Sequence, residues 1–264
     1  MILKILQRNN VKITGNGERT ILFAHGFGCD QKMWRFVAPA FEGEYRTVVF
    51  DQVGAGNSRI DQYEVASYAS LDRYAEDVLE ICSVLDIKDC IYVGHSVASM
   101  IGVLAALKAP GLFSKMVLIG PSPCYVNRGS YIGGFDASEM DYLLEVLDAN
   151  YVAWARAMAP TIMGNLDRPE LGAELSESFC RADPVIARQF ARVTFLSDNR
   201  EDLEKLVVPT LILQCSEDPI APELVGKFVH SRIQGSSYIQ LRATGHCPNM
   251  SSPDETIAAI RTFV

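Results

Sequence analysis

The sequence predicts a protein of the α/β class, with a mostly parallel sheet flanked by helices and one all-helical insertion. Short β-branched runs alternate with longer amphipathic runs along the chain, which is typical of strands joined by helical crossovers. The candidate strands are nearly continuous apolar runs, as expected for parallel strands that are buried on both faces. The stretch 123–195 contains helical patterns but no convincing strand.

The strands follow from turn signals and apolar runs. The segment 11–26 predicts an opening hairpin, because Gly15-Asn16-Gly17 supplies a turn between two β-rich runs. Further strands are expected at 46–51, 90–96, 115–121, 209–218 and 237–243.

Helices are expected between these strands, at 30–41, 70–86, 97–110, 222–233 and 253–264. Within 70–86, the residues Tyr74, Val78, Ile81 and Leu85 recur at helical spacing and give the helix one apolar face. The last two helices each begin with a proline, which suits the first turn of a helix.

The order of these elements predicts a core formed by residues 1–122 and 196–264, interrupted by a helical cap at 123–195. Core-type strands resume after the insertion, so the cap is not expected to be an independent domain. An insertion at the carboxyl end of a parallel sheet is well placed to roof a pocket.

Composition narrows the class of function. The chain has 264 residues, 48% of them hydrophobic, which is enough for a substantial core without a disulfide or metal staple. The formal charge of −8 argues against binding nucleic acid or an anionic membrane surface. The N-terminal apolar run is too short for a signal peptide, and no run reaches the length of a membrane helix.

Metals and cofactors are not expected. The seven cysteines are scattered without a Cys-x-x-Cys, which fits reduced thiols in a cytoplasmic protein. There is no His-Glu-x-x-His zinc motif. The Gly54-Ala55-Gly56 stretch lacks the third glycine of a dinucleotide fingerprint and reads as a turn after a strand.

Ser96 is the first candidate for chemistry. It stands where a buried strand turns sharply into an apolar helix, within Gly94-His95-Ser96-Val97-Ala98. This is nearly the Gly-x-Ser-x-Gly elbow that lifts a serine hydroxyl above a sheet, with Ala98 in place of the last glycine. The alternative is an ordinary serine that caps the following helix.

An acid and a base follow Ser96 in the order that such a serine requires. Of the two later histidines, His246 lies in a loop after the last strand, whereas His230 falls in an amphipathic helix and reads as a surface residue. Asp218 ends a core strand and is preferred over its neighbour Glu217 as the acid that orients His246. The alternative is that Asp218 only caps the next helix.

The loop after the first core strand predicts the remaining part of the site. It contains His25-Gly26-Phe27-Gly28, at the place where an oxyanion-hole amide is expected. We assign the hole to the backbone N–H groups of Phe27 and Val97. His25 precedes Ser96 and is expected to brace this loop rather than to act as the base.

Five stretches together resemble a known family: AHGFGCDQKMW, DQVGAGNS, YVGHSVASMIGVLA, LIGPSPCYVN and TGHCPNMSSPDE. They are similar to a group of α/β-hydrolases that contains the bacterial stress-response regulator RsbQ and the plant karrikin and strigolactone receptors. The resemblance covers nearly the whole chain and places the triad on Ser96, Asp218 and His246. RsbQ-like elbows keep a glycine where this chain has Ala98, and the plant receptors carry a serine there, so the alanine does not imply an inactive enzyme.

The resemblance also implies a V-shaped cap of four helices over a hydrophobic pocket. The implied lining residues are Phe27, Tyr125, Leu143, Trp154 and Phe195. The alternative for Leu143 and Trp154 is packing between cap helices without contact to a ligand.

The function expected from these observations is hydrolysis of a small hydrophobic ester or lactone, serving stress signalling as in RsbQ-like proteins. The resemblance implies a protein partner, a phosphatase with a PAS domain. The alternative is a ligand receptor or regulatory partner in which hydrolysis is slow or incidental.

Overall fold

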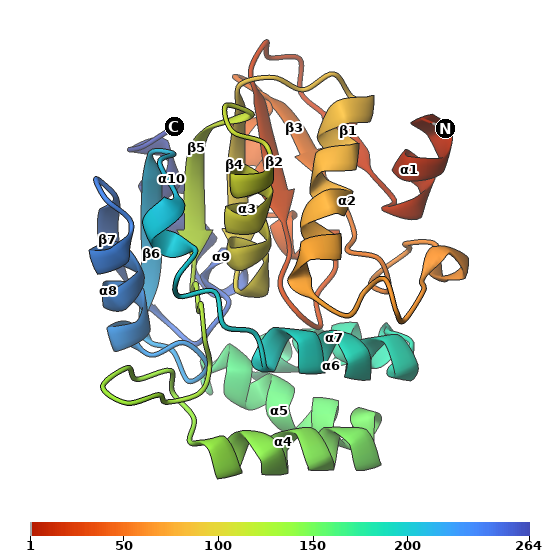
Figure 1. Cartoon of the computed structure of the whole chain (residues 1–264), viewed down its shortest axis with the longest axis vertical. Coiled ribbons are helices and arrows are strands. Elements are labelled where there is room, and N and C mark those ends of the chain that lie inside the picture. The colour runs from red at the N-terminus through yellow and green to blue at the C-terminus, as the bar shows by residue number, and fades with distance from the viewer. Residues whose placement is uncertain (1) are drawn as a thin grey trace.

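The computed structural model describes residues 2–264, and it confirms the predicted α/β fold with a mostly parallel sheet (Figure 1). Seven strands lie in the order β1-β3-β2-β4-β5-β6-β7, and all neighbours pair in parallel except β1 and β3. The strands are β1 (Lys12–Thr14), β2 (Thr20–Ala24), β3 (Arg46–Val49), β4 (Cys90–His95), β5 (Phe113–Ile119), β6 (Thr210–Glu217) and β7 (Ser237–Thr244).

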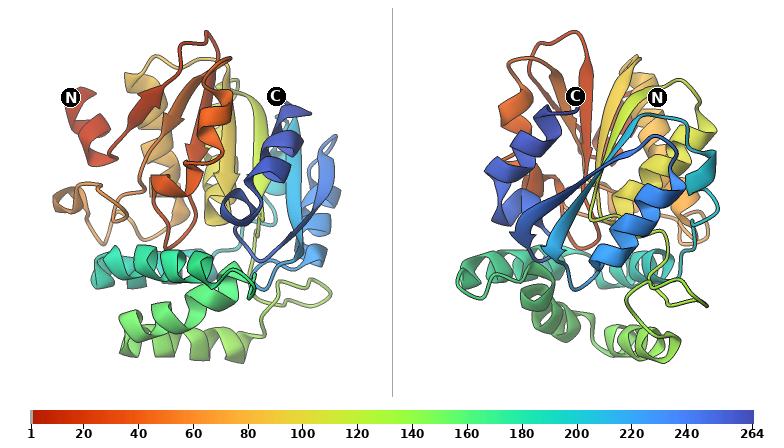
Figure 2. Two further views of the ribbon diagram at one scale, coloured as in Figure 1. Left: turned by 180° about the vertical axis from the view of Figure 1, so that it is seen from behind. Right: turned by 90° about the vertical axis from the view of Figure 1, so that its left-hand side faces the viewer.

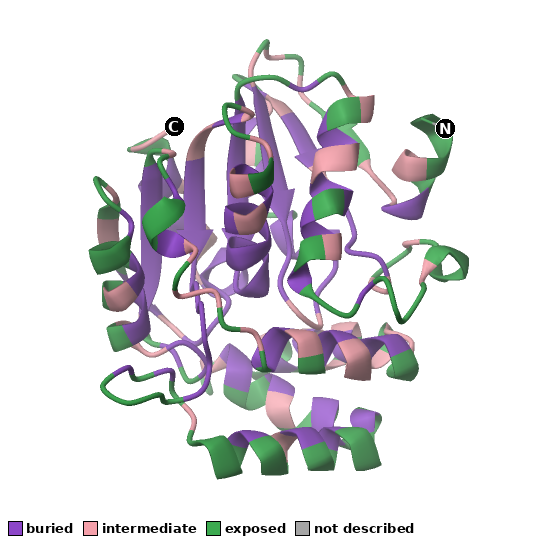
Figure 3. Ribbon diagram, in the orientation of Figure 1, coloured by how far each residue is buried: buried purple, intermediate pink, exposed green. Residues whose placement is uncertain are grey.

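Helices cover both faces of the sheet (Figures 1 and 2). One face carries α2 (Leu71–Val84), α3 (Val97–Lys108) and α8 (Glu223–Arg232), and the other carries α10 (Pro253–Arg261). The short helices α1 (Ile2–Arg8) and α9 (Pro248–Ser251) lie beside α2 and β7 respectively. The inner strands β2, β4, β5 and β6 are largely buried, whereas the edge strand β1 is exposed and β7 is partly exposed. The helices that cover the sheet expose their outer sides (Figure 3).

Four helices form a separate layer beneath the sheet in Figure 1, at the end where the parallel strands terminate. They are α4 (Ala137–Ala149), α5 (Tyr151–Met163), α6 (Pro169–Arg181) and α7 (Pro184–Phe195), and all follow β5 and precede β6. This layer is called the cap below. Within residues 2–264, no helix has both the length and the apolar character needed to cross a bilayer.

Two local predictions are wrong. The opening hairpin does not form, because β3 lies between β1 and β2 and pairs with both of them. The Gly15–Gly17 segment instead passes the residues just before β3 so closely that a Cβ on Gly17 would lie 2.2 Å from the Glu44 carbonyl oxygen.

The predicted helix over 30–41 is also wrong, since the segment forms two short 3₁₀ helices, η1 (Gln31–Trp34) and η2 (Ala38–Phe41). Pro39 has no N–H to continue an α-helix and its ring would clash with the preceding turn. The two short helices pack Trp34 and Phe41 against Phe23 of β2.

Candidate active site

Ser96 lies at the apex of the turn between β4 and α3. Its backbone has φ 58° and ψ −127°, a conformation that L-residues rarely adopt, and its side chain makes no capping bond to α3. Space at this turn is tight, because a Cβ on Gly94 would lie 2.7 Å from the carbonyl oxygen of Ala98. The strained backbone therefore turns the hydroxyl away from the helix end and leaves it for another partner.

That partner is His246. Its Nε2 lies 2.8 Å from the Ser96 Oγ, and its Nδ1 lies 2.7 Å from the Asp218 Oδ2. All three residues are buried. Because an ionised carboxylate only accepts, Nδ1 carries the proton and Nε2 presents its lone pair to the serine hydroxyl.

Asp218 is held by the backbone as well as by the histidine. Its Oδ1 accepts hydrogen bonds from the N–H groups of Ile220 and Ala221, at 2.8 and 3.0 Å. Glu217 and His230, the competing acid and base, are both exposed, and His230 contacts Ser236 instead. The structure thus brings Ser96, Asp218 and His246 together and keeps the two competitors apart from them.

His95, directly before Ser96, contacts the main chain of His246. This contact was not predicted from the sequence. Its Nε2–H donates to the His246 carbonyl oxygen at 2.7 Å, and the two imidazole rings lie 5.0 Å apart. Burial, together with the neighbouring His246, lowers the pKa of His95 to about 3. His95 is therefore a neutral donor at neutral pH.

The loop that carries Phe27 is braced by His25, as expected. The His25 Nδ1–H donates to the Gly26 carbonyl at 2.8 Å, and the Gln52 N–H donates to its Nε2 at 2.9 Å. Burial lowers the pKa of His25, which keeps this two-sided arrangement neutral. Among residues 2–264, no protein acceptor takes the N–H of Phe27 or of Val97.

Aromatic rings from the cap surround the side chain of Phe27. It contacts Trp154, Phe179, Phe190 and Phe195, with ring centroids 5.4 to 6.2 Å apart. Phe179 and Phe190 were not predicted as neighbours of Phe27. The helical periodicity of α6 and α7 indicates an apolar face but does not show which residues that face contacts.

Tyr125 joins this cluster through Phe195, at a centroid distance of 5.2 Å. Its hydroxyl is buried beside Ser96 and forms no hydrogen bond of good geometry within residues 2–264. Burial raises the pKa of Tyr125, so the hydroxyl stays protonated and remains a donor.

Leu143 lies further out than the other predicted lining residues. It is half-buried on α4 and, with Trp154, Tyr142 and Met158, lines an apolar groove of about 640 Å³ between α4 and α5. Trp154 therefore faces both this groove and the ring cluster around Phe27.

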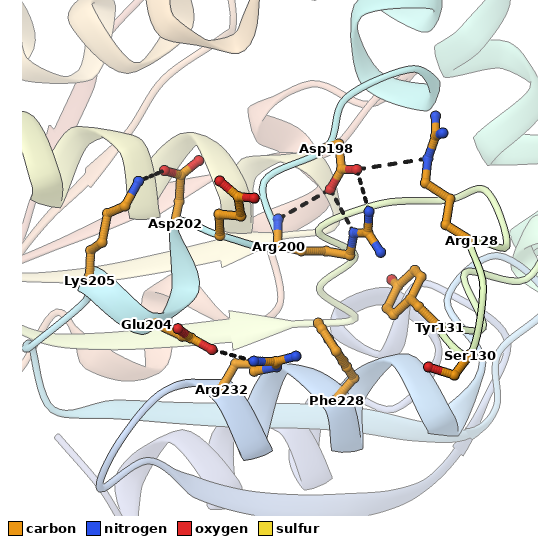
Figure 4. Close-up of a pocket in the computed structure, with 11 residues that line it drawn as sticks. Arg128, Ser130, Tyr131, Asp198, Arg200, Asp202, Glu204, Lys205, Phe228 and Arg232 are labelled. Carbon is orange, nitrogen blue, oxygen red and sulfur yellow. Dashed lines mark hydrogen bonds and ion pairs between the residues drawn. The ribbon is translucent and has the colours of Figure 1, made fainter.

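A second, polar groove of about 960 Å³ lies where the two chain segments that lead into and out of the cap meet α8 (Figure 4). Asp198 pairs with both Arg128 and Arg200, while Lys205 pairs with Asp202 and Arg232 with Glu204. Because each cation already has a carboxylate partner, the groove joins the two segments and offers little unpaired charge to a ligand.

Comparison with known proteins identifies the family to which this chain belongs. The sequence profile described as "Alpha/beta hydrolase family" matches residues 21–259. The karrikin insensitive 2 receptor CA of Petunia hybrida is 38% identical, over 96% of this chain and 94% of the relative. A strigolactone esterase of Arabidopsis thaliana is also 38% identical, over 97% and 96%. The solved structure of a hydrolase from Oleispira antarctica is 40% identical, with a TM-score of 0.96 over 99% of this chain and 96% of that one.

Proposed function

The chain belongs to the α/β-hydrolase family, and from that premise we propose that it is a serine hydrolase acting on a small hydrophobic ester or lactone. The observation that supports this most is the hydrogen-bonded series Ser96–His246–Asp218. The apolar rings around Phe27 favour an uncharged substrate with a small hydrophobic acyl group.

In the proposed reaction, the Ser96 Oγ attacks the ester carbonyl and its proton passes to the His246 Nε2. Asp218 fixes the tautomer of His246 and stabilises the imidazolium that forms. The negative charge on the substrate oxygen is met by the N–H groups of Phe27 and Val97.

Collapse of this intermediate breaks the bond to the alcohol oxygen, which takes the proton from His246. Water then attacks the acyl group on Ser96, with His246 as the base, and the acid product leaves. The cycle needs no cofactor, because every proton that moves has a donor and an acceptor within the three residues and water.

Hydrolysis of p-nitrophenyl acetate tests the proposal. Ser96→Ala and His246→Ala should each lower kcat by several orders of magnitude, since triad members act as a unit. His230→Ala is the matched control and should keep the full rate, because this histidine is exposed. Wild-type rates in Ser96→Ala, or the absence of a fluorophosphonate adduct on Ser96, would contradict the proposal.

We also propose a signalling use of the same site, as a slow hydrolase or ligand receptor that regulates a PAS-domain phosphatase in a stress response. The similarity to the karrikin insensitive 2 receptor CA supports the receptor part of this proposal. The exposed side chain of Tyr142, beside the apolar groove of the cap, suits contact with a partner.

Co-purification with such a phosphatase tests the signalling proposal. Tyr142→Ala should weaken the complex and leave ester hydrolysis unchanged. A stress response that persists unaltered with cap-surface variants would contradict signalling and leave the hydrolase proposal intact.

A further inference from the structure

The backbone of His246 is held from two sides. Its carbonyl oxygen accepts from His95, which belongs to the core. Its N–H donates to the carbonyl oxygen of Ile162 at 2.9 Å, in the last turn of cap helix α5. The carbonyl groups of a last helical turn have no partner within the helix, so this bond satisfies one of them. The residue at the centre of the proposed chemistry therefore bridges the core and the cap.

The turn after α5 adds further bonds to the same part of the core. The side-chain amide of Asn165 donates to the Thr244 carbonyl oxygen at 3.0 Å, two residues before His246. One guanidinium nitrogen of Arg168 donates to the Ser251 carbonyl oxygen at 2.7 Å, and the other donates to the Asn165 Oδ1 at 2.6 Å. Arg168 thus fixes the amide that contacts the end of β7.

The cap and the core meet here backbone to backbone. A Cβ on Gly245 would lie 1.9 Å from the Met163 carbonyl oxygen, and a Cβ on Gly164 would lie 3.1 Å from the Gly245 Cα. Both glycines have positive φ, 75° and 63°, which suits residues without a Cβ. A contact this close transmits displacement, since there is no flexible side chain between the two main chains to absorb it.

We infer that the α5–α6 turn, residues 164–168, is a positioning element for His246, with Asn165 and Arg168 as its positioning residues. This inference rests on the proposed hydrolase function and extends it. The covalent connections of the cap run through the polar groove beside α8, whereas the turn attaches the cap directly to the base loop. The position of the cap and the distance from His246 to Ser96 are therefore coupled.

Two variants remove the turn's side-chain bonds with little other change. Asn165→Gly deletes the amide and tolerates the positive φ of 57° at this position. Arg168→Met keeps most of the aliphatic chain and removes both donors, while Arg168→Lys restores one of them. Arg192→Met is the matched control, because Arg192 is a cap arginine whose partner, Asp148, also lies in the cap.

With p-nitrophenyl acetate, kcat should fall about tenfold in Asn165→Gly and Arg168→Met with little change in KM, since small misplacement of a catalytic group is costly. Arg168→Lys should recover part of the loss, and Arg192→Met should retain the wild-type kcat. Wild-type kcat in both turn variants would overturn the inference. An equal loss in Arg192→Met would also overturn it, because the effect would then be a general loosening of the cap.

A spectroscopic readout separates this inference from the proposed function. The low-field proton NMR signal of the His246 Nδ1–H reports its bond to Asp218 without any turnover. It should shift or broaden in Asn165→Gly and Arg168→Met, but not in Arg192→Met. A protein without esterase activity whose signal responds in this way would refute the hydrolase and keep the positioning role. If the wild type is an active hydrolase but the turn variants change neither the signal nor kcat, the hydrolase proposal stands and the positioning role is refuted.

Discussion

His95 should make the stability of the protein sensitive to mild acid. Its pKa is lowered from 6.5 to about 3 by burial and by His246, so in the folded protein it stays neutral as the pH falls. In the unfolded chain the same imidazole takes up a proton near its ordinary pKa. The contribution of His95 to stability is therefore fully present above about pH 6.5 and is lost progressively as the pH falls toward 3.

The size of the effect follows from one proton. Below the unfolded pKa, the free energy of unfolding should drop by about 1.4 kcal/mol per pH unit, or about 2 kcal/mol between about pH 7.5 and about pH 5. His95→Gln removes the titration but keeps a neutral donor that can reach the His246 carbonyl. The variant should lose less stability than the wild type over this interval.

Urea unfolding followed by circular dichroism at several pH values measures the difference. Groups away from His95 titrate in both proteins, so their contributions cancel in the comparison. Among them are His25, whose pKa is lowered by burial, and Asp77, whose pKa burial raises to about 6 and which acts in the opposite direction. His230→Gln, at an exposed histidine, is the matched control. Parallel curves for wild type and His95→Gln would refute the reasoning.

Three further substitutions test other parts of the structure. Asp218→Asn keeps an oxygen that accepts from the N–H groups of Ile220 and Ala221, but its amide N–H₂ reverses the tautomer of His246. The kcat for p-nitrophenyl acetate should therefore fall about 10⁴-fold, with the melting temperature nearly unchanged. A small loss of kcat would argue against Asp218 as the acid. Tyr92→Phe removes the buried hydroxyl bond to the Ala98 carbonyl, 2.7 Å long, and should cost about 1 kcal/mol in urea unfolding, whereas no loss would show that the bond has no net value. Ala98→Gly should cost about 1 kcal/mol of stability and leave kcat unchanged, and a changed kcat would show that the alanine tunes the site.

Much of the fold was predictable, because buried parallel strands carry a strong apolar signal and connect through helices of recognisable period. The opening hairpin failed for a non-local reason. The chain does reverse its direction between β1 and β2, with its bend at Glu18 and Arg19, but β3, more than twenty residues later in the chain, lies between them. A turn signal says where the chain bends and not which strand will pair.

The residues of the site were predictable to different degrees. Ser96, Asp218 and His246 were predicted from the near-elbow motif, from the chain order serine, acid, histidine, and from the position of each residue after a core strand. Asn165 and Arg168 lie in a polar loop of the cap, where such residues are common and carry no pattern. Their contacts with the end of β7 exist only once two distant segments are folded together. Membership of the RsbQ-like subgroup, and the role of the pocket residues, stay predictions.

The ring cluster around Phe27 has a consequence for how this protein can change its substrate. On the proposed assignment, the N–H of Phe27 stabilises the negative charge on the substrate oxygen while its side chain faces the acyl group. A substitution at Phe27 would therefore change the shape of the acyl site and could also displace the N–H group that catalysis needs. Phe179, Phe190 and Phe195 contact the same ring from α6 and α7, and none of them is assigned to the oxyanion hole. Selection for new substrates, in evolution or in the laboratory, should therefore act on the cap rings and conserve position 27.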